Sequence, residues 1–275
     1  MELKNKYILL VTGNTLAVIL TIVVNTLAVV LPLNGKSTQE LSDNIPNLFV
    51  PAGITFSIWS VIYVFLIFFM IYQMLSLSKK QQYDKSYIEK IGGWFVLASI
   101  ANTSWILLWH YEFVTYSLLA MILLFISLLV IYLRLNINLS TASLKEKIAV
   151  HTTISFYIGW ITVATIANVT AVLVKLDVGE FFLGQVTWTF LIIAVATLIS
   201  ILILIKRKDI AYNLVIIWAL LGIVIKRLNP DPIYGIQTSI AMVAAAIIVI
   251  ILVMFIKFGL SFYRKKSKAQ KITSN

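Results

Sequence analysis

Long apolar runs alternate with short polar segments along the whole chain, and this alternation predicts eight membrane-spanning helices. A helix rises 1.5 Å per residue, so about 17–25 apolar residues cross the hydrocarbon core of a bilayer. The predicted spans are residues 7–31, 51–77, 91–109, 114–133, 148–174, 184–205, 210–225 and 236–258. The seventh run is the shortest, and its limits are the least well defined.

Composition supports this reading. The chain is 60% hydrophobic and 12% charged, whereas a soluble domain is about half apolar and about one quarter charged. All eleven acidic residues lie outside the apolar runs. We therefore predict an all-α integral membrane protein whose main partner is the lipid bilayer. The absence of cysteine excludes disulfides, a thiolate catalyst and a cysteine-ligated metal.

The net charge of +11 reflects topology rather than nucleic-acid binding, because lysines and arginines concentrate in alternate segments between the spans. Eighteen of them, including Lys79 and Lys80, fall on the side of the N-terminus, and four fall on the other side. The four are Lys36, Lys175, Lys226 and Arg227. By the positive-inside rule, both termini lie in the cytoplasm, and we expect a bacterial plasma membrane.

An aromatic face enters the second span. Pro51 stands where a helix can begin, because its missing N–H would have no partner in a first turn. Phe56, Trp59 and Tyr63 follow at steps of three and four, so they share one helix face. Trp59 lies about 13 Å below the helix start. That is too deep for an ordinary interfacial tryptophan.

Two further spans carry a similar face of aromatic and amide side chains in the outer half of the membrane. Its members are Asn102, Trp105 and Trp109 in span 91–109, and Tyr157, Trp160, Ala164 and Asn168 in span 148–174. An asparagine facing lipid is costly, so these faces should point into the bundle. The spacing alone fits a packed polar seam and a ligand pocket equally well.

The first span and the loop after it leave two questions open. Asn14 and Asn25 are eleven residues apart and so share one helix face. We favour hydrogen bonds to neighbouring helices over contact with a ligand for both. The outer loop 32–49 is longer than the other outer loops. It fits a lid over the bundle or a plain connector.

Three stretches resemble motifs of the TspO family, the translocator or tryptophan-rich sensory proteins. Residues 50–63 are similar to the entry of its second helix, with a proline, a spaced phenylalanine, a tryptophan and a tyrosine. Asn102-Thr-Ser-Trp105 is similar to its Asn-x-x-Trp on helix 3, and residues 156–168 to its Tyr-x-x-Trp-x-x-x-Ala-x-x-x-Asn on helix 5. The chain departs from the family pattern at Ala52, Ser60 and Phe156. The resemblance covers about residues 1–175.

The resemblance implies a five-helix bundle over 1–175 with a hydrophobic pocket capped by the first loop. Residues 176–275 would add three helices and a basic cytoplasmic tail. Family members bind tetrapyrroles, sterols and drug-like molecules, and transport, sensing and porphyrin breakdown have all been proposed as roles. Four positions are thereby implied as pocket lining, namely Trp59, Asn102, Trp160 and Ala164. Four more match motif positions but fit packing equally well, namely Tyr63, Trp105, Tyr157 and Asn168.

Three functions are compatible with these features. The first is a receptor or carrier for a planar hydrophobic ligand such as a tetrapyrrole or sterol, since stacked aromatics supply flat contact and an amide orients a polar edge. The second is a secondary transporter of a neutral small solute; carriers of charged solutes usually place ionisable groups within the spans, and we identify none there. The third is an intramembrane enzyme built on His110 and Glu112. A lone His–Glu pair in a short loop is more typical of a solvated cap.

We therefore expect no catalytic residues, no metal site and no resident cofactor, with a tetrapyrrole considered only as a ligand. His151 lies far from His110 and cannot join it in a metal or haem site. The role of the last three helices stays open between a second bundle face, a dimer surface and a substrate path. Ala241 and Ala245 form a small-xxx-small pair suited to close helix contact, which is compatible with a homodimer.

Overall fold

The computed structural model describes residues 2–31, 33–78, 84–178, 180–231 and 233–273, and side chains are described outside 2–3, 180–183 and 259–273. These residues contain helices and no strand, which confirms the predicted all-α class. Lys79 and Lys80, two of the predicted inner cations, lie outside the described residues.

Eight long helices account for the eight predicted spans. They are α1 (Glu2–Val30), α3 (Ile58–Ser76), α5 (Trp94–His110), α6 (Val114–Arg134), α8 (Thr152–Lys175), α9 (Glu180–Arg207), α10 (Ile210–Leu228) and α11 (Thr238–Thr273). Shorter helical segments connect or extend them. These are η1 (Leu33–Gly35), α2 (Thr38–Asp43), η2 (Gly53–Ser57), α4 (Ser86–Ile91), α7 (Leu144–Glu146) and the π-helical η3 (Lys147–His151), which leads into α8.

Seven of these helical segments are long and apolar enough to cross a bilayer. The eighth, α5, has 17 residues, which is at the short end of the spanning range. The helix expected to be shortest, 210–225, instead continues to Leu228 as α10. It includes the two cations: Lys226 pairs with Asp43 at 2.8 Å, and the buried Arg227 lies 3.7 Å from Asp231.

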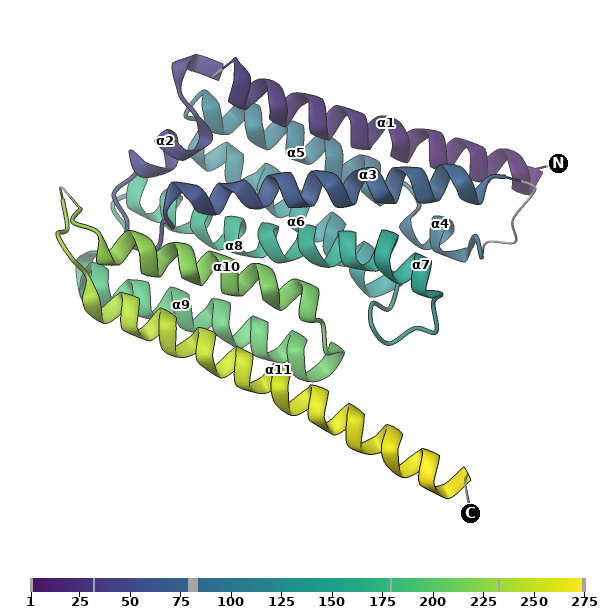
Figure 1. The fold of residues 1–275 in the computed structure, drawn as a ribbon. Coiled ribbons are helices and arrows are strands. Elements are labelled where there is room, and N and C mark those ends of the chain that lie inside the picture. Colours follow the sequence, from purple (N-terminus) through teal and green to yellow (C-terminus); the bar gives the residue numbers. More distant parts are fainter. Residues whose placement is uncertain (1, 32, 79–83, 179, 232, 274–275) are drawn as a thin grey trace.

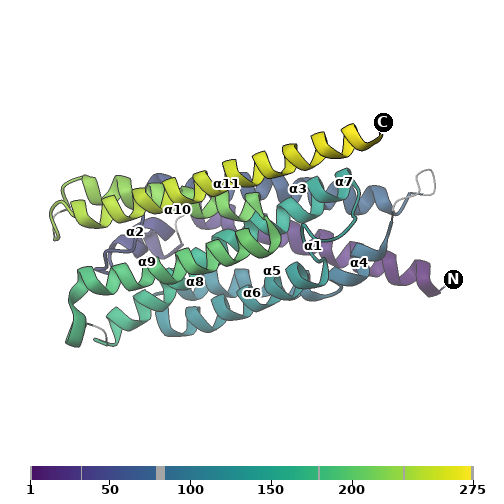
Figure 2. The same cartoon turned by 90° about the horizontal axis from the view of Figure 1, so that it is seen from below.

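The long helices run roughly along one axis, and α2 covers one end of the bundle (Figures 1 and 2). Both ends of the chain lie toward the opposite end, as an even number of crossings requires. In the packing, α5 contacts α1 and α6, α8 contacts α6 and α10, and α10 also packs against α11. The orientation of the bundle in the membrane stays a prediction.

Large apolar side chains cover the outside of the bundle. Leu9, Leu119 and Met242 are each more than 60% exposed, on three different long helices. Because a lipid tail is as apolar as leucine, such faces are stable only in a bilayer. The asparagines of the spans turn inward, and Asn14, Asn102 and Asn168 are each at most 2% exposed.

A polar seam joins α1 to α3 and α5. Asn14 Nδ2 donates to Gln73 Oε1 at 2.9 Å, and Asn25 Nδ2 donates to Asn102 Oδ1 at 2.6 Å. Between them, Thr21 Oγ1 and Ser99 Oγ lie 2.8 Å apart. The prediction that Asn14 and Asn25 bond neighbouring helices is confirmed.

The last three helices are joined closely to the earlier ones. Asp209, at the start of α10, is 1% exposed, and its Oδ2 accepts from Tyr132 Oη of α6 at 2.8 Å and Ser155 Oγ of α8 at 2.6 Å. Its Oδ1 caps the helix by accepting from the Tyr212 N–H at 3.1 Å. One carboxylate therefore connects three helices.

The middle of α10 supports the entry to α3. The Ala52 N–H donates to the Gly222 carbonyl at 2.9 Å, and Trp218 Nε1 donates to the Thr55 carbonyl at 2.9 Å. A Cβ at Gly222 would collide with Thr55 Oγ1 and crowd Pro51. This close approach sets the position of the segment that leads to Trp59.

Candidate ligand site

A small cavity lies between α3, α5 and α8, at the end of the bundle that α2 covers. Its volume is about 50 Å³. It is lined by Thr38, Ser42, Asn47, Val50, Pro51, Phe56, Trp59, Trp105, Trp109, Trp160, Val163, Ala164, Ala167, Asn168 and Ala171. None of these lining side chains is charged, so an occupant would be held by apolar contact and neutral hydrogen bonds.

Five of the fifteen lining residues are aromatic, and their rings contact one another. The ring centroids of Trp59 and Trp160 lie 6.4 Å apart at 81°, and those of Phe56 and Trp160 lie 5.9 Å apart at 80°. On α5, Trp105 and Trp109 stack at 5.9 Å and 22°, as neighbours four residues apart on one helix face can. Aromatic edges and faces thus meet around the cavity in geometries that such rings prefer.

Small residues on α8 leave the space between the rings. Ala164, Ala167 and Ala171 are spaced three and four residues apart, so their methyl groups form a shallow strip along the cavity. Larger side chains at these positions would fill it. The space that these alanines border, between Trp160 of the same helix and the tryptophans of α3 and α5, is called the slot below.

Asn168 closes the slot with a satisfied amide. Its Oδ1 accepts from Trp105 Nε1 at 3.0 Å, and its Nδ2 donates to Ser117 Oγ of α6 at 3.2 Å. The side chain is 2% exposed. These bonds fix the Trp105 indole plane, so Asn168 both lines the cavity and positions one of its walls.

Five of the eight predicted site residues line this cavity, namely Trp59, Trp105, Trp160, Ala164 and Asn168. Two more touch its wall from behind. Tyr63 stacks on Trp59 at 5.7 Å, and Tyr157 meets the same ring edge-on at 6.0 Å. The eighth, Asn102, lies in the polar seam against Asn25, where its buried Nδ2 has no hydrogen-bond partner. Ligand contact by these residues stays a prediction.

Several lining residues were not predicted, although some carried a signal. Trp109 shares the helix face of Trp105, and Phe56 shares that of Trp59. Ala167 and Ala171 continue the spacing of Ala164. The loop residues that close the top, such as Thr38 and Asn47, follow no helical period, so the sequence pattern could not identify them.

The segment between α1 and α3 covers the outer end of the cavity. Ser37 and Glu40 form a reciprocal capping box that starts α2. Asn34 Nδ2 donates to the His110 carbonyl at 3.0 Å, and Asp43 pairs with Lys226 at 2.8 Å. The segment is therefore attached to α5 on one side and to α10 on the other. Whether it opens as a lid stays a prediction.

His110 and Glu112, the pair considered for an intramembrane enzyme, do not contact each other through their side chains: each has a different partner. His110 is fully buried, contrary to a solvated cap, and its Nδ1 donates to the Ile106 carbonyl at 2.8 Å. Glu112 turns away to Lys36 at 2.6 Å, and this hydrogen bond and the lysine charge lower the pKa of its carboxyl. The geometry brings no acid–base pair together at this place.

Four ionisable side chains are buried at or near helix ends, namely Asp209, Arg227, Glu146 and His151. His151 Nε2 lies 3.6 Å from Glu146 Oε1, beside the π-helical turn of η3. Among the described residues, no three metal-ligating side chains come together.

Comparison with known proteins gives one match. A family profile described as "TSPO-like protein" matches residues 9–257. The match begins in α1, crosses the boundary predicted at 175, and ends in α11. Neither the comparison with curated proteins nor that with solved structures returned a match.

Proposed function

Since the chain belongs to the TSPO-like protein family, a family of membrane receptors and carriers, we propose that it binds a planar hydrophobic ligand in the slot between α3, α5 and α8. Tetrapyrroles and sterols are the ligand classes that the motif resemblance implies. Binding would serve sensing or transport rather than catalysis. The family is generally one of non-enzymatic receptors and transporters.

The observation that carries the proposal is the slot itself. Tryptophans of α3 and α5 line the cavity together with Trp160 and a strip of alanines of α8, and none of the lining side chains is charged. Flat apolar ring systems gain most from such walls, because stacked and edge-on contacts add to the burial of their surface. A packed seam would instead fill the space opposite the alanines with larger side chains.

The volume sets a condition on the proposal. About 50 Å³ holds a few water molecules, whereas ligand pockets usually measure about 300–1,000 Å³. The walls must therefore move apart to admit a ring system. Trp59 and Phe56 are only partly buried, which leaves them room to change rotamer.

The test compares wild type with Trp160→Ala and Ala164→Phe. Loss of a buried aromatic anchor costs about 2 kcal/mol or more, which is roughly thirty-fold in affinity. Ala164→Phe should abolish binding by filling the slot, with little change in melting temperature if the position faces open space. The measurement is titration with protoporphyrin IX in detergent, followed by porphyrin absorbance, with melting temperatures taken on the same samples.

A different result would contradict the proposed ligand site. If wild type binds neither porphyrin nor sterol, and Ala164→Phe lowers unfolding stability by about 1–3 kcal/mol as overpacking does, the aromatic faces are a packing seam. The assignment would then return to a transporter of a neutral small solute.

A further inference from the structure

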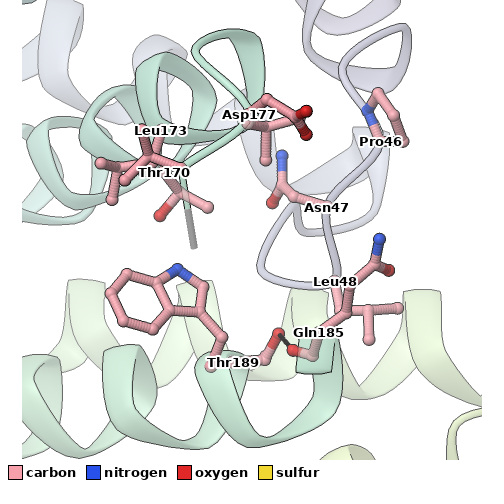
Figure 3. Close-up of a pocket in the computed structure, with 11 residues that line it drawn as sticks. Pro46, Asn47, Leu48, Thr170, Leu173, Asp177, Gln185 and Thr189 are labelled. Carbon is pink, nitrogen blue, oxygen red and sulfur yellow. Dashed lines mark hydrogen bonds between the residues drawn. The ribbon is translucent and has the colours of Figure 1, made fainter. Parts of the chain in front are cut away.

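A second, larger cavity adjoins the first at the outer end of the bundle. Its volume is about 260 Å³. It is lined by Pro46, Asn47, Leu48, Thr170, Leu173, Val174, Asp177, Val178, Gln185, Trp188 and Thr189. Figure 3 shows Thr170 and Leu173 of α8 on one side, Gln185 and Thr189 of α9 on the other, and the loop at Asn47 and Leu48 beside them.

A thin partition separates the two cavities. Asn47 lines both of them, and Thr170 of the larger cavity is followed in the chain by Ala171 of the smaller one. Leu48, 2% exposed, packs beside Asn47. One loop turn and one turn of α8 therefore stand between the tryptophan slot and α9.

The bonds that shape this loop turn are local. Asn47 Nδ2 donates to the Ile45 carbonyl at 3.1 Å, and Asn47 Oδ1 accepts from the Phe49 N–H at 3.1 Å. Such an asparagine turn holds its own backbone without tying it to a helix. The firm attachments lie at either end, where Asp43 meets Lys226 and Ala52 meets Gly222. A shift of the turn would keep these attachments, and its cost would be the apolar packing of Leu48 and Phe49, which are each 2% exposed.

We propose that α9 completes the ligand site: when the turn at Asn47 and Leu48 shifts, the two cavities join, and Trp188 and Gln185 contact the ligand. This inference rests on the proposed function. It meets the volume condition, because the two cavities together approach the lower end of the range for ligand pockets, about 300 Å³.

The chemistry of the added wall defines the ligand further. Trp188 supplies another aromatic face, while Thr170, Asp177 and Gln185 supply polar atoms at the outer rim. The apolar slot would hold one part of a ring system, and the rim would hold a polar edge of it. The site therefore suits a planar amphipathic molecule better than a wholly apolar one.

The absence of native cysteine allows a direct test. Gln185→Cys places a single thiol in the larger cavity, and Ser239→Cys places one on the exposed start of α11 as the control. Each variant is labelled with a maleimide fluorophore, with and without saturating protoporphyrin IX. The porphyrin should slow labelling at position 185 about tenfold or more and leave position 239 unchanged.

A second pair of variants tests the volume. Thr189→Trp fills the cavity from α9, and Leu191→Trp adds the same side chain on the same helix at a position that is 46% exposed. Thr189→Trp should weaken porphyrin binding about tenfold or more, as loss of contacts at a binding hot spot does. Leu191→Trp should bind as wild type. Melting temperatures confirm that both variants are folded.

The outcomes separate the two proposals. If wild type binds porphyrin and Trp160→Ala weakens it, but position 185 stays unprotected and Thr189→Trp binds normally, α9 is not part of the site and the proposed function stands. If wild type binds no porphyrin at all, both proposals fail together. Protection at position 185 with weaker binding in Thr189→Trp supports the assignment of α9.

Discussion

Helix α5 presents asparagine and tryptophan side chains to two neighbours, and the two contacts differ in kind. Toward α1, Asn102 pairs with Asn25 in a seam in which hydroxyl and amide groups bond directly across the helices. Toward α8, Trp105 and Trp109 border a cavity, and the amide that α8 contributes there, Asn168, bonds back to Trp105 and to α6. Hydrogen-bonded polar pairs fill the contact between α5 and α1. The contact between α5 and α8 leaves a cavity between aromatic rings and alanines.

This difference explains why the spacing of aromatic and amide residues along a helix does not by itself distinguish a packed polar seam from a ligand pocket. Amide partners satisfy each other and draw two helices together. At the contact with α8, the indole rings and the alanine methyl groups leave a cavity of about 50 Å³ between them. The same residue types therefore stabilise the bundle on one side of α5 and form the candidate site on the other.

The largest expected effect is at Gly222, which supports the pocket wall from behind. Gly222→Ala forces a Cβ into Thr55 and Pro51, and such overpacking costs about 1–3 kcal/mol. We expect a lower melting temperature and weaker porphyrin binding together, since Pro51 lines the slot. The control is Gly13→Ala on α1, whose Cβ would meet Val96 at an ordinary 3.5 Å. Equal behaviour of the two variants would show that α10 does not support the site.

A smaller effect is expected in the seam. Asn102→Leu removes the acceptor of Asn25, and interhelical hydrogen bonds in membranes are worth about 0.6 kcal/mol on average. Stability should fall by about 1 kcal/mol while porphyrin affinity stays within a few-fold of wild type. The measurements are melting temperature and titration, with Trp160→Ala as the reference for a site residue. Lost affinity at unchanged stability would mean that the free Nδ2 of Asn102 serves the ligand.

The sequence pattern predicts those parts of the molecule that follow a period. Apolar run length identifies the eight long helices, and spacings of three and four bring Trp59, Trp105, Trp160, Ala164 and Asn168 to one cavity. Helix spacing places a residue on a face but does not tell which neighbour that face meets. Asn102 and Trp105 thus turn to different partners although they are three residues apart.

Features that depend on distant contacts could not be read in this way. The two cations Lys226 and Arg227 led to the prediction that the span ends at residue 225, yet α10 continues to Leu228. There Lys226 pairs with Asp43, which is 183 residues away in the chain. The loop turn at Asn47 carries no helical period, although it borders both cavities. From the sequence alone, Asp209 is interpreted as a charged residue in a loop between two spans. The structure shows that it is buried and accepts hydrogen bonds from Tyr132 and Ser155.

The smallest effect should come from the exposed pair of Lys36 and Glu112, outside both the seam and the slot. The two side chains are 41% and 49% exposed, so water and salt screen their attraction. Glu112→Ala and Lys36→Ala should leave porphyrin affinity unchanged and lower the melting temperature only slightly.

The small contribution of this pair to stability should depend on pH. Because Lys36 lowers the pKa of Glu112, the contribution is fully present above the usual carboxyl pKa, about 4.3. It is lost as the pH falls through the lowered value. The difference in melting temperature between wild type and Glu112→Ala should therefore be constant from pH 7 to about 5 and shrink at lower pH, and added salt should reduce it at any pH. A thousand-fold loss of turnover of a bound porphyrin in Glu112→Ala, with binding intact, would instead make this end of α5 a catalytic centre.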